Sequence, residues 1–181
     1  DTFFASLITI VGGTLSAGGS NAINMWFDAD IDQHMRRTQN RPVPLGHISA
    51  NGALIFGIII AVLGSALFLL VSWKAAFWSF FSVLFYVFVY TIWLKRRTPQ
   101  NIVIGGIAGS TPPLIGWAVA AADYTSNYNP LDLGSAIPWM LFALIFLWTP
   151  PHFWALALYR SGEYAKAKVP MTVSYTHLTL P

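Results

Sequence analysis

Three acidic side chains lie close together in a chain that carries few charges. Asp28, Asp30 and Asp32 stand within five residues, although the whole chain of 181 residues contains only seven Asp and Glu. An α-helix advances about 100° per residue, so Asn24, Asp28 and Asp32 share one face. Asp30 points elsewhere. Oxygen ligands one turn apart suit Mg²⁺, which takes one or two protein carboxylates and completes its shell with water and phosphate oxygens.

Three arginines, Arg36, Arg37 and Arg41, follow this acidic run. Their planar guanidinium groups can bind phosphate oxygens through two parallel hydrogen bonds. Carboxylates that hold a metal beside guanidinium groups are the composition expected of a diphosphate site, where metal and bases together neutralise a leaving group. The alternative interpretation is a solvated loop whose acids and bases pair locally, which the strict spacing of four disfavours.

The composition is that of a polytopic membrane protein. The chain is 55% hydrophobic and 9% charged, and it contains no cysteine, which excludes a disulfide framework, a thiolate nucleophile and a cysteine-based metal site. Five apolar stretches are each long enough to cross a hydrocarbon core of about 30 Å. We therefore expect an all-α transmembrane bundle with spans at Phe3 to Asn24, Gly52 to Trp73, Ala75 to Leu94, Ile102 to Ala122 and Ala136 to Tyr159.

The basic residues are distributed unevenly between the two ends of these spans. Nine of the ten Lys and Arg residues follow the first, third or fifth span, and only Lys74 falls between the second and the third. The positive-inside rule places the nine on the cytoplasmic or mitochondrial-matrix side, together with Asp28, Asp32 and Glu163. This topology accounts for the net charge of +3, and no basic stripe with stacking aromatics indicates nucleic-acid binding.

Two spans contain proline pairs, at Pro112–Pro113 and Pro150–Pro151. Proline removes a backbone donor and clashes with the preceding turn, so both helices are expected to kink or unwind locally. Each pair suggests a pocket wall, although kinked helices that only pack are equally common. His152 follows the second pair and is a candidate to contact a metal, a heme iron or propionate, or a neighbouring carbonyl. Close helix packing is predicted at Gly12, Gly13, Gly18, Gly19, Gly105, Gly106 and Gly109.

The run from Asn24 to Asp32, continued by MRRTQNRP, resembles the first aspartate-rich motif of the UbiA family of intramembrane prenyltransferases. Two further stretches, KRRTPQNIVIGG and WTPPHFWALALYR leading into EYAKAKVPM, are similar to the branch of that family that farnesylates heme. The resemblance covers nearly all of the chain up to Met171. It implies a central cavity enclosed by nine spans, of which this chain would supply five. It also implies an Mg²⁺-dependent transfer of a farnesyl group from farnesyl diphosphate to a vinyl group of heme B, giving heme O.

The resemblance also implies roles for individual residues. Asn24, Asp28, Asp32 and Glu163 would hold the metal, and Asp28, Asp32, Arg37 and Arg41 would be the catalytic set. The implied substrate-binding set consists of Asn24, Lys95, Arg96, Arg97, His152, Tyr159, Arg160, Glu163 and Tyr164. The implied surroundings are the lipid bilayer of a bacterial cell (inner) membrane or of the mitochondrial inner membrane, with contact to heme A synthase or oxidase assembly proteins.

The chain begins at Asp1 with no initiator Met and no signal-peptide pattern, so we expect it to be a piece of a longer protein. After Met171 the sequence TVSYTHLTLP departs from the family pattern. Residues 1–171 are therefore predicted to be part of a UbiA-type domain, and 172–181 a truncated or non-native tail. A fragment that lacks the remaining spans is expected to retain substrate poorly, and in isolation it can be inactive.

Three other functions are compatible with parts of the sequence. A UbiA enzyme that acts on an aromatic or quinone precursor would share the diphosphate site and differ in the acceptor pocket. A transporter would also have interrupted helices, but its binding site is expected near the bilayer midplane, whereas these acids cluster at one membrane face. A non-catalytic assembly protein would retain the fold without turnover.

Overall fold

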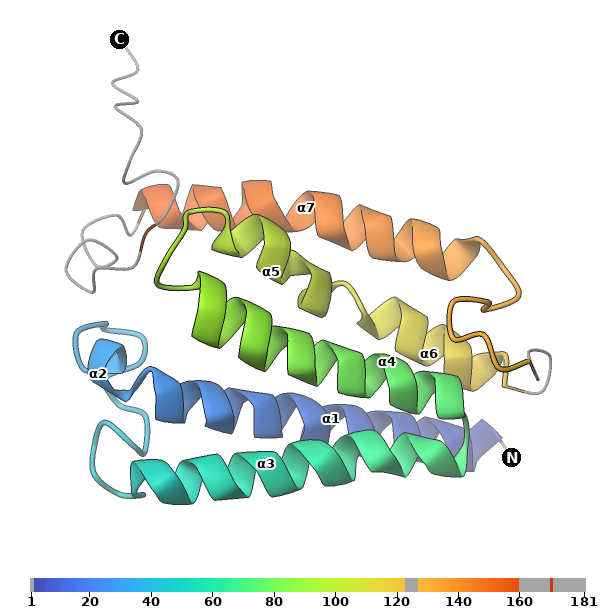
Figure 1. Ribbon diagram of the computed structural model, residues 1–181, viewed down its shortest axis with the longest axis horizontal. Coiled ribbons are helices and arrows are strands. Elements are labelled where there is room, and N and C mark those ends of the chain that lie inside the picture. Colours follow the sequence, from blue (N-terminus) through green and yellow to red (C-terminus); the bar gives the residue numbers. More distant parts are fainter. Residues whose placement is uncertain (1, 123–126, 160–169, 171–181) are drawn as a thin grey trace, which may run out of the picture.

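The computed structural model describes residues 2–122, 127–159 and 170 (Figure 1). Every regular element among them is a helix. Arg160, Glu163, Tyr164 and the tail 172–181 lie outside the described residues. The elements are α1 (Thr2–Phe27), α2 (Ala29–Asp32), α3 (Ala50–Leu67), the 3₁₀-helix η1 (Phe68–Leu70), α4 (Trp73–Leu84), the π-helix η2 (Phe85–Leu94), α5 (Asn101–Gly109), α6 (Pro112–Ala120) and α7 (Ile137–Tyr159).

Five helical stretches are long and apolar enough to cross a membrane. They confirm the predicted all-α fold and its five spans, with ends that differ from the predicted ones by a few residues. Three of these stretches combine elements, since η1 continues α3, η2 continues α4, and α6 follows α5 after a short break. The stretches are Thr2–Phe27, Ala50–Leu70, Trp73–Leu94, Asn101–Ala120 and Ile137–Leu158.

The spans lie side by side in a bundle (Figure 1). The tightest pair is α1 with α3, while α4 packs on α6, and both α5 and α6 pack on α7. Helix η2 is in contact with both α1 and α5, so it packs between these two helices. This arrangement brings the end of α1, the end of η2, the start of α5 and the last turns of α7 to the same end of the bundle (Figure 1).

Small residues allow the close contact between α1 and α3. A Cβ atom added to Gly19 would lie 2.4 Å from the Ala61 nitrogen, and one added to Gly64 would lie 2.4 Å from the Ser16 nitrogen. No side chain fits in such a space, so the two backbones can approach only because these positions are glycine. The predicted packing role does not extend to every glycine of α1, because a Cβ on Gly13 or Gly18 would meet nothing within 4 Å.

The two proline pairs have different effects on their helices. Pro112–Pro113 begin α6, and the fourth span is interrupted just before them at Ser110–Thr111, which confirms the predicted unwinding. Pro150–Pro151 lie inside α7, which continues through them as a helix, so the predicted unwinding does not occur there. Membrane helices tolerate proline where nearby side chains support the backbone. The Thr149 hydroxyl, just before the pair, donates to the Ile145 carbonyl, whereas the carbonyls that lose a donor to the two prolines are those of Phe146 and Leu147.

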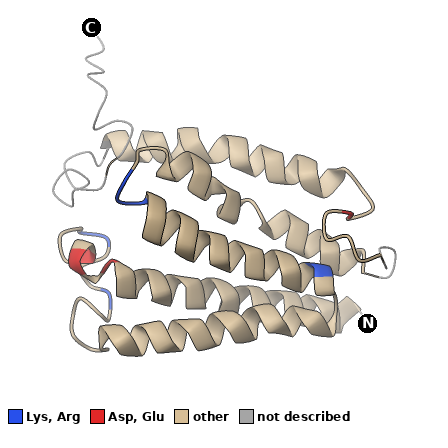
Figure 2. Ribbon diagram, viewed as in Figure 1, with Lys and Arg blue, Asp and Glu red and all other residues tan. Residues whose placement is uncertain are grey.

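Charged side chains gather at one end of the bundle, where α1 meets α2 and η2 meets α5 (Figure 2). Lys74, in the first turn of α4, donates to the Asp132 carbonyl, so these two residues lie at the other end of the third span from Lys95. The predicted separation of charge between the two ends of the spans is therefore present in the fold.

Candidate functional site

The acidic face lies at the junction of α1 and α2. The Asp28 nitrogen donates to the Asn24 carbonyl at 2.9 Å, and the Asp32 nitrogen donates to the Asp28 carbonyl at 2.8 Å, so helical spacing continues through the junction. Asn24, Asp28 and Asp32 are 4%, 0% and 3% exposed, whereas the Asp30 side chain is 66% exposed. The three residues spaced by four thus share the inner face, and Asp30 lies outside it, as the spacing predicts.

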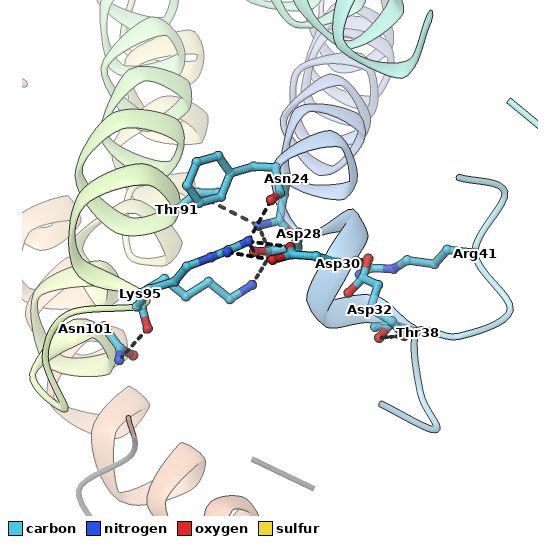
Figure 3. A network of polar contacts seen from close by, with 11 residues as sticks. Asn24, Asp28, Asp30, Asp32, Thr38, Arg41, Thr91, Lys95 and Asn101 are labelled. Atoms are coloured by element: carbon cyan, nitrogen blue, oxygen red, sulfur yellow. Dashed lines mark hydrogen bonds and ion pairs between the residues drawn. The ribbon is translucent and has the colours of Figure 1, made fainter. Parts of the chain in front are cut away.

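Asp28 is held by residues from two spans. Its Oδ2 atom accepts a hydrogen bond from Asn24 Nδ2 at 2.8 Å and a second from the Lys95 ammonium group, with which it forms an ion pair (Figure 3). Asn24 Nδ2 also lies 3.3 Å from the hydroxyl oxygen of Thr91, which is fully buried. Lys95 and Thr91 come from the end of the third span, so this network joins α1 to η2.

The third span ends in ten residues of π-helix rather than α-helix. π-Helical turns are rare and frequently mark functional sites. Within η2, the rings of Tyr86 and Tyr90 are stacked with their centroids 5.4 Å apart. Gly105 on α5 makes room for the Tyr90 ring, because a Cβ atom at position 105 would lie 2.3 Å from Tyr90 Cδ2. The predicted packing role of Gly105 is therefore specific to one tyrosine.

The other two aspartates pair with different arginines. Arg41 Nη1 donates to Asp32 Oδ2 at 2.7 Å, and the Thr38 hydroxyl donates to the Asp32 carbonyl at 3.2 Å (Figure 3). Arg96 forms a bidentate pair with Asp30, at 2.9 Å and 2.7 Å. The hydrogen bonds from Arg96 lower the pKa of Asp30, and those to Asp30 raise the pKa of Arg96.

One buried carboxylate oxygen has no hydrogen-bond partner among the residues that the structure describes. Asp28 Oδ1 accepts none, and the nearest base, Arg96 Nη2, lies 3.6 Å away. Burying an unsatisfied carboxylate oxygen is unfavourable, so such an atom indicates a place for a ligand. A hard oxygen donor beside an amide suits a magnesium ion. In the part of the chain that the structure describes, no three His, Cys, Asp or Glu side chains form a metal cluster.

A cavity of about 410 Å³, here called the site cavity, extends from this network into the bundle. Basic side chains line its outer end, and the stacked tyrosines, the glycines of α5 and the last turns of α7 line its depth. A smaller space of about 80 Å³ beside it reaches Asp32. The site cavity is lined by Asn21, Asn24, Arg37, Arg41, Tyr86, Tyr90, Lys95, Ile102, Gly105, Gly106, Gly109, Thr149, Phe153 and Leu156.

A separate inner cavity of about 300 Å³ lies deeper between α1, α4 and α6. It continues along the same helices as the site cavity, since Ser20 is followed by Asn21 and Val83 is one turn before Tyr86. Six of its lining residues carry hydroxyl groups, and each hydroxyl is engaged in a hydrogen bond within the protein. These residues are Thr9, Ser16, Ser20, Ser79, Ser82 and Thr111.

The remaining predicted site residues occupy varied positions. Arg37 lines the site cavity, whereas Arg97 is exposed and is not among the residues that line either part of it. His152 is exposed on α7 and stacks on Trp148, with ring centroids 4.3 Å apart, while its neighbour Phe153 faces the cavity. Tyr159 ends α7. The structure thus brings Asn24, Asp32, Arg37, Arg41 and Lys95 together along the two spaces. Asp28 is fully buried against Asn24 and Lys95 and is not itself a lining residue, and Arg96, Arg97 and His152 also lie outside the lining.

Sequence reasoning missed three groups that shape the site. Thr91 lies four residues before Lys95, a spacing that could have been read as a shared face. Asn101 is buried and donates its amide hydrogens to the Thr98 carbonyl at 2.6 Å and the Pro170 carbonyl at 3.0 Å. This fixes the loop that carries Lys95. The tyrosine pair of η2 had no signal beyond its spacing of four.

Comparison with known proteins identifies the relatives of this chain. Residues 2–177 match the UbiA prenyltransferase family. A protein named protoheme IX farnesyltransferase from Parvibaculum lavamentivorans is 53% identical over 169 residues, which are 93% of this chain and 49% of that protein. The proteins of the same name from Bartonella henselae and Caulobacter vibrioides are each 51% identical, over 93% and 91% of this chain and 50% and 46% of their own lengths.

The chain therefore spans about half the length of the curated relatives it matches. No solved structure matches it. The family match covers nearly the whole chain, and the five apolar helices fit a membrane-embedded enzyme. This chain belongs to the UbiA prenyltransferase family.

Proposed function

We propose that this chain forms the diphosphate-binding half of an enzyme that transfers a farnesyl group from farnesyl diphosphate to a vinyl group of heme B, giving heme O. The observation that carries the proposal is the buried Asp28 carboxylate, which pairs with two residues that line the site cavity, Asn24 and Lys95, and whose second oxygen accepts no hydrogen bond among the described residues. Relatives named protoheme IX farnesyltransferase, at 50% identity and above, support heme as the acceptor.

Asn24, Asp28 and Asp32 are the residues that would hold Mg²⁺ in this proposal. Their oxygens are the ligand type that Mg²⁺ prefers, and the open Asp28 Oδ1 offers a coordination position. When bound, the metal would neutralise charge on the diphosphate leaving group. Glu163, an additional ligand implied by the family resemblance, lies outside the described residues.

The basic residues of the cavity supply the rest of the leaving-group stabilisation. Arg37, Arg41 and Lys95 line its outer end, where they can bind the diphosphate as the bond between its oxygen and the first farnesyl carbon breaks. The stacked faces of Tyr86 and Tyr90 lie along the same cavity and can stabilise the allylic cation. The vinyl group of heme would then form the new carbon–carbon bond as diphosphate leaves. Water would add at the vinyl carbon next to the macrocycle and lose one proton to solvent, so the products are the hydroxylated heme, diphosphate and a proton.

The inner cavity is where the farnesyl chain would extend. Its hydroxyl groups are all engaged in hydrogen bonds within the protein, so the wall suits a hydrocarbon better than a charged group such as a heme propionate. From Asn24 to Gly13 on α1, eleven residues span about 16 Å of helix. That distance suits a chain of a few isoprene units.

The proposed location follows from the same features. The five membrane-capable helices make the chain an integral membrane protein. Six of the described Lys and Arg residues lie at the end that carries the site (Figure 2), and the positive-inside rule supports a cytoplasmic or matrix orientation of that end. We propose a bacterial inner membrane or a mitochondrial inner membrane. Contact with heme A synthase or oxidase assembly proteins belongs to the same proposal.

A chimera tests the activity, because the chain covers half of its relatives. This chain would replace the matching half of the Parvibaculum lavamentivorans relative, and the purified chimera would be incubated with Mg²⁺, farnesyl diphosphate and heme B. Mass spectrometry should detect heme O. A prenylated product from a hydroxybenzoate acceptor, with none from heme, would overturn the acceptor assignment, and no product from any acceptor would overturn the enzyme assignment.

A further inference from the structure

Arg96 is held by two partners that both lie on the outer side of the acidic face. Its Nη1 and Nη2 atoms donate to the two oxygens of Asp30, and Nη2 also donates to the Phe27 carbonyl at 2.8 Å. The guanidinium carbon lies 4.8 Å from the centroid of the Phe27 ring. This side chain is therefore fixed by a bidentate pair, a backbone acceptor and an aromatic ring.

The same Nη2 atom forms a longer ion pair with Asp28 Oδ1, at 3.6 Å, which is beyond hydrogen-bond distance. Asp28 is fully buried, and Oδ1 accepts no hydrogen bond. The buried Asp28 oxygen also attracts this guanidinium, because little water screens the pair, but the two hydrogen bonds to Asp30 hold Arg96 in its observed position. Without Asp30, a small movement of Arg96 would close the contact with Asp28.

We infer that Asp30 is a positioning residue that keeps the Arg96 guanidinium off Asp28 Oδ1 and so leaves that oxygen open for a divalent cation. The inference rests on the proposed function, since it concerns access of the cation to Asp28. Asp30 is not a ligand in this arrangement. Its carboxylate serves as the preferred acceptor for a base that would otherwise compete with the metal for the same oxygen.

Binding of Mn²⁺ to the chain in detergent, followed by electron paramagnetic resonance with and without inorganic pyrophosphate, tests this without requiring turnover. Asp30→Asn should weaken Mn²⁺ binding about tenfold, because Arg96 then occupies Asp28 Oδ1. The double variant Asp30→Asn/Arg96→Gln should return the affinity to within about twofold of the original chain. Asp30→Glu, which keeps the carboxylate, should bind Mn²⁺ nearly as well as the original.

A charge-matched control separates the contact from a change in net charge. Asp30→Asn/Arg97→Gln has the same net charge as the rescuing double variant but leaves Arg96 in place. It should bind Mn²⁺ as weakly as Asp30→Asn alone. The difference between the two double variants should also persist at about 1 M salt, where the Debye length is about 3 Å and interactions between separated exposed charges are screened.

Three results would overturn the inference. Unchanged binding by Asp30→Asn would show that Arg96 does not compete. Weak binding that Arg96→Gln fails to rescue would make Asp30 itself a ligand or a structural requirement. Equal rescue by Arg96→Gln and Arg97→Gln would reduce the effect to net charge.

The proposed function can fail separately. If the original chain binds no Mn²⁺ even with pyrophosphate, the metal part of that proposal is wrong, and an experimental structure of the Asp30→Asn variant decides the positioning role. Arg96 Nη2 within hydrogen-bond distance of Asp28 Oδ1 would support it. Arg96 remaining outside that distance would refute it.

Discussion

The third membrane span has a lysine at each end, and the two lysines have different partners. Lys74 is 1% exposed, and its ammonium group donates to Asn127 Oδ1 at 3.0 Å and to the Asp132 carbonyl at 2.5 Å. Lys95 pairs with the Asp28 carboxylate, whose second oxygen accepts no hydrogen bond from the described residues. Buried polar groups that satisfy one another stabilise the fold, whereas an unsatisfied one beside a cavity is available to a ligand.

The surroundings of the two lysines support this distinction. At the Lys74 end, the indole groups of Trp78 and Trp117 donate to the carbonyls of Pro130 and Leu133, both at 3.0 Å, so the described part of the loop is fastened to α4 and α6. At the Lys95 end, the polar network borders a cavity of about 410 Å³. One end closes the bundle, and the other offers a binding site.

Replacing one aspartate by asparagine at each end of the bundle should give the largest difference in the rate of farnesyl transfer. Asp28→Asn in the chimera should lower farnesyl transfer about a hundredfold to a thousandfold, because it removes charge that stabilises the metal and the leaving group. Asp132→Asn at the opposite end should leave transfer within about twofold. Initial rates measured by mass spectrometry check both. Equal losses in the two variants would mean that the ends do not differ in function.

The inner cavity gives a second contrast, between two glycines on the same helix. Gly13 lines this cavity, whereas Gly18 does not, and a Cβ on either would meet nothing within 4 Å. Gly13→Leu should shift the ratio of turnover with farnesyl diphosphate to that with geranyl diphosphate about tenfold toward the shorter chain. Gly18→Leu is the matched control and should not change the ratio. A similar ratio in both variants would place the prenyl chain elsewhere.

Replacing the two lysines should separate stability from binding. Lys74→Met removes the donor of the Asp132 carbonyl and one of the two donors of Asn127 Oδ1, which should lower the free energy of unfolding by about 1–3 kcal/mol. Thermal unfolding in lipid nanodiscs measures this loss, and pyrophosphate affinity should stay unchanged. Lys95→Met should weaken pyrophosphate binding. If Lys74→Met weakens pyrophosphate binding as much as Lys95→Met does, the proposed distinction between a structural end and a binding end is wrong.

The smallest expected difference is in how the pKa values of two carboxylates outside the spans respond to salt. Hydrogen bonds from Arg96 lower the pKa of Asp30, and the Gly134 N–H and the Asn127 amide lower that of Asp132. Both lowered values mean that these contacts stabilise the fold above about pH 4 and that the stabilisation is lost as the pH falls through each folded-state pKa. Added salt should raise the pKa of Asp30 more, because its main partner is charged. Carboxyl ¹³C NMR titration measures the two shifts, and equal salt responses would contradict this.

The sequence was sufficient to predict the features that depend on local spacing. The five spans follow from hydropathy and length, and the shared face of Asn24, Asp28 and Asp32 follows from a spacing of four on a helix. The charged end of the bundle follows from the uneven distribution of Lys and Arg. These features need no information about which spans are neighbours.

Features that depend on contacts between spans were not predictable. The Asp28 to Lys95 pair joins residues 67 positions apart, and its geometry depends on the π-helical winding of η2. The orientation of His152 was equally hidden, because α7 is apolar on all sides and its sequence does not indicate which face packs inward. The same dipeptide, Pro-Pro, begins a helix in α6 and lies inside one in α7.

The π-helix also makes the two ends of the third span differ in rotational register. In η2 each backbone N–H reaches five residues back instead of four, so its ten residues complete fewer turns than the same number would in α4. Deleting a single residue from η2 should change this winding and rotate Lys95 about the helix axis relative to Lys74. Lys74 would keep its position, so the loss of one residue would misalign the Lys95 end of the span and leave the Lys74 end unchanged.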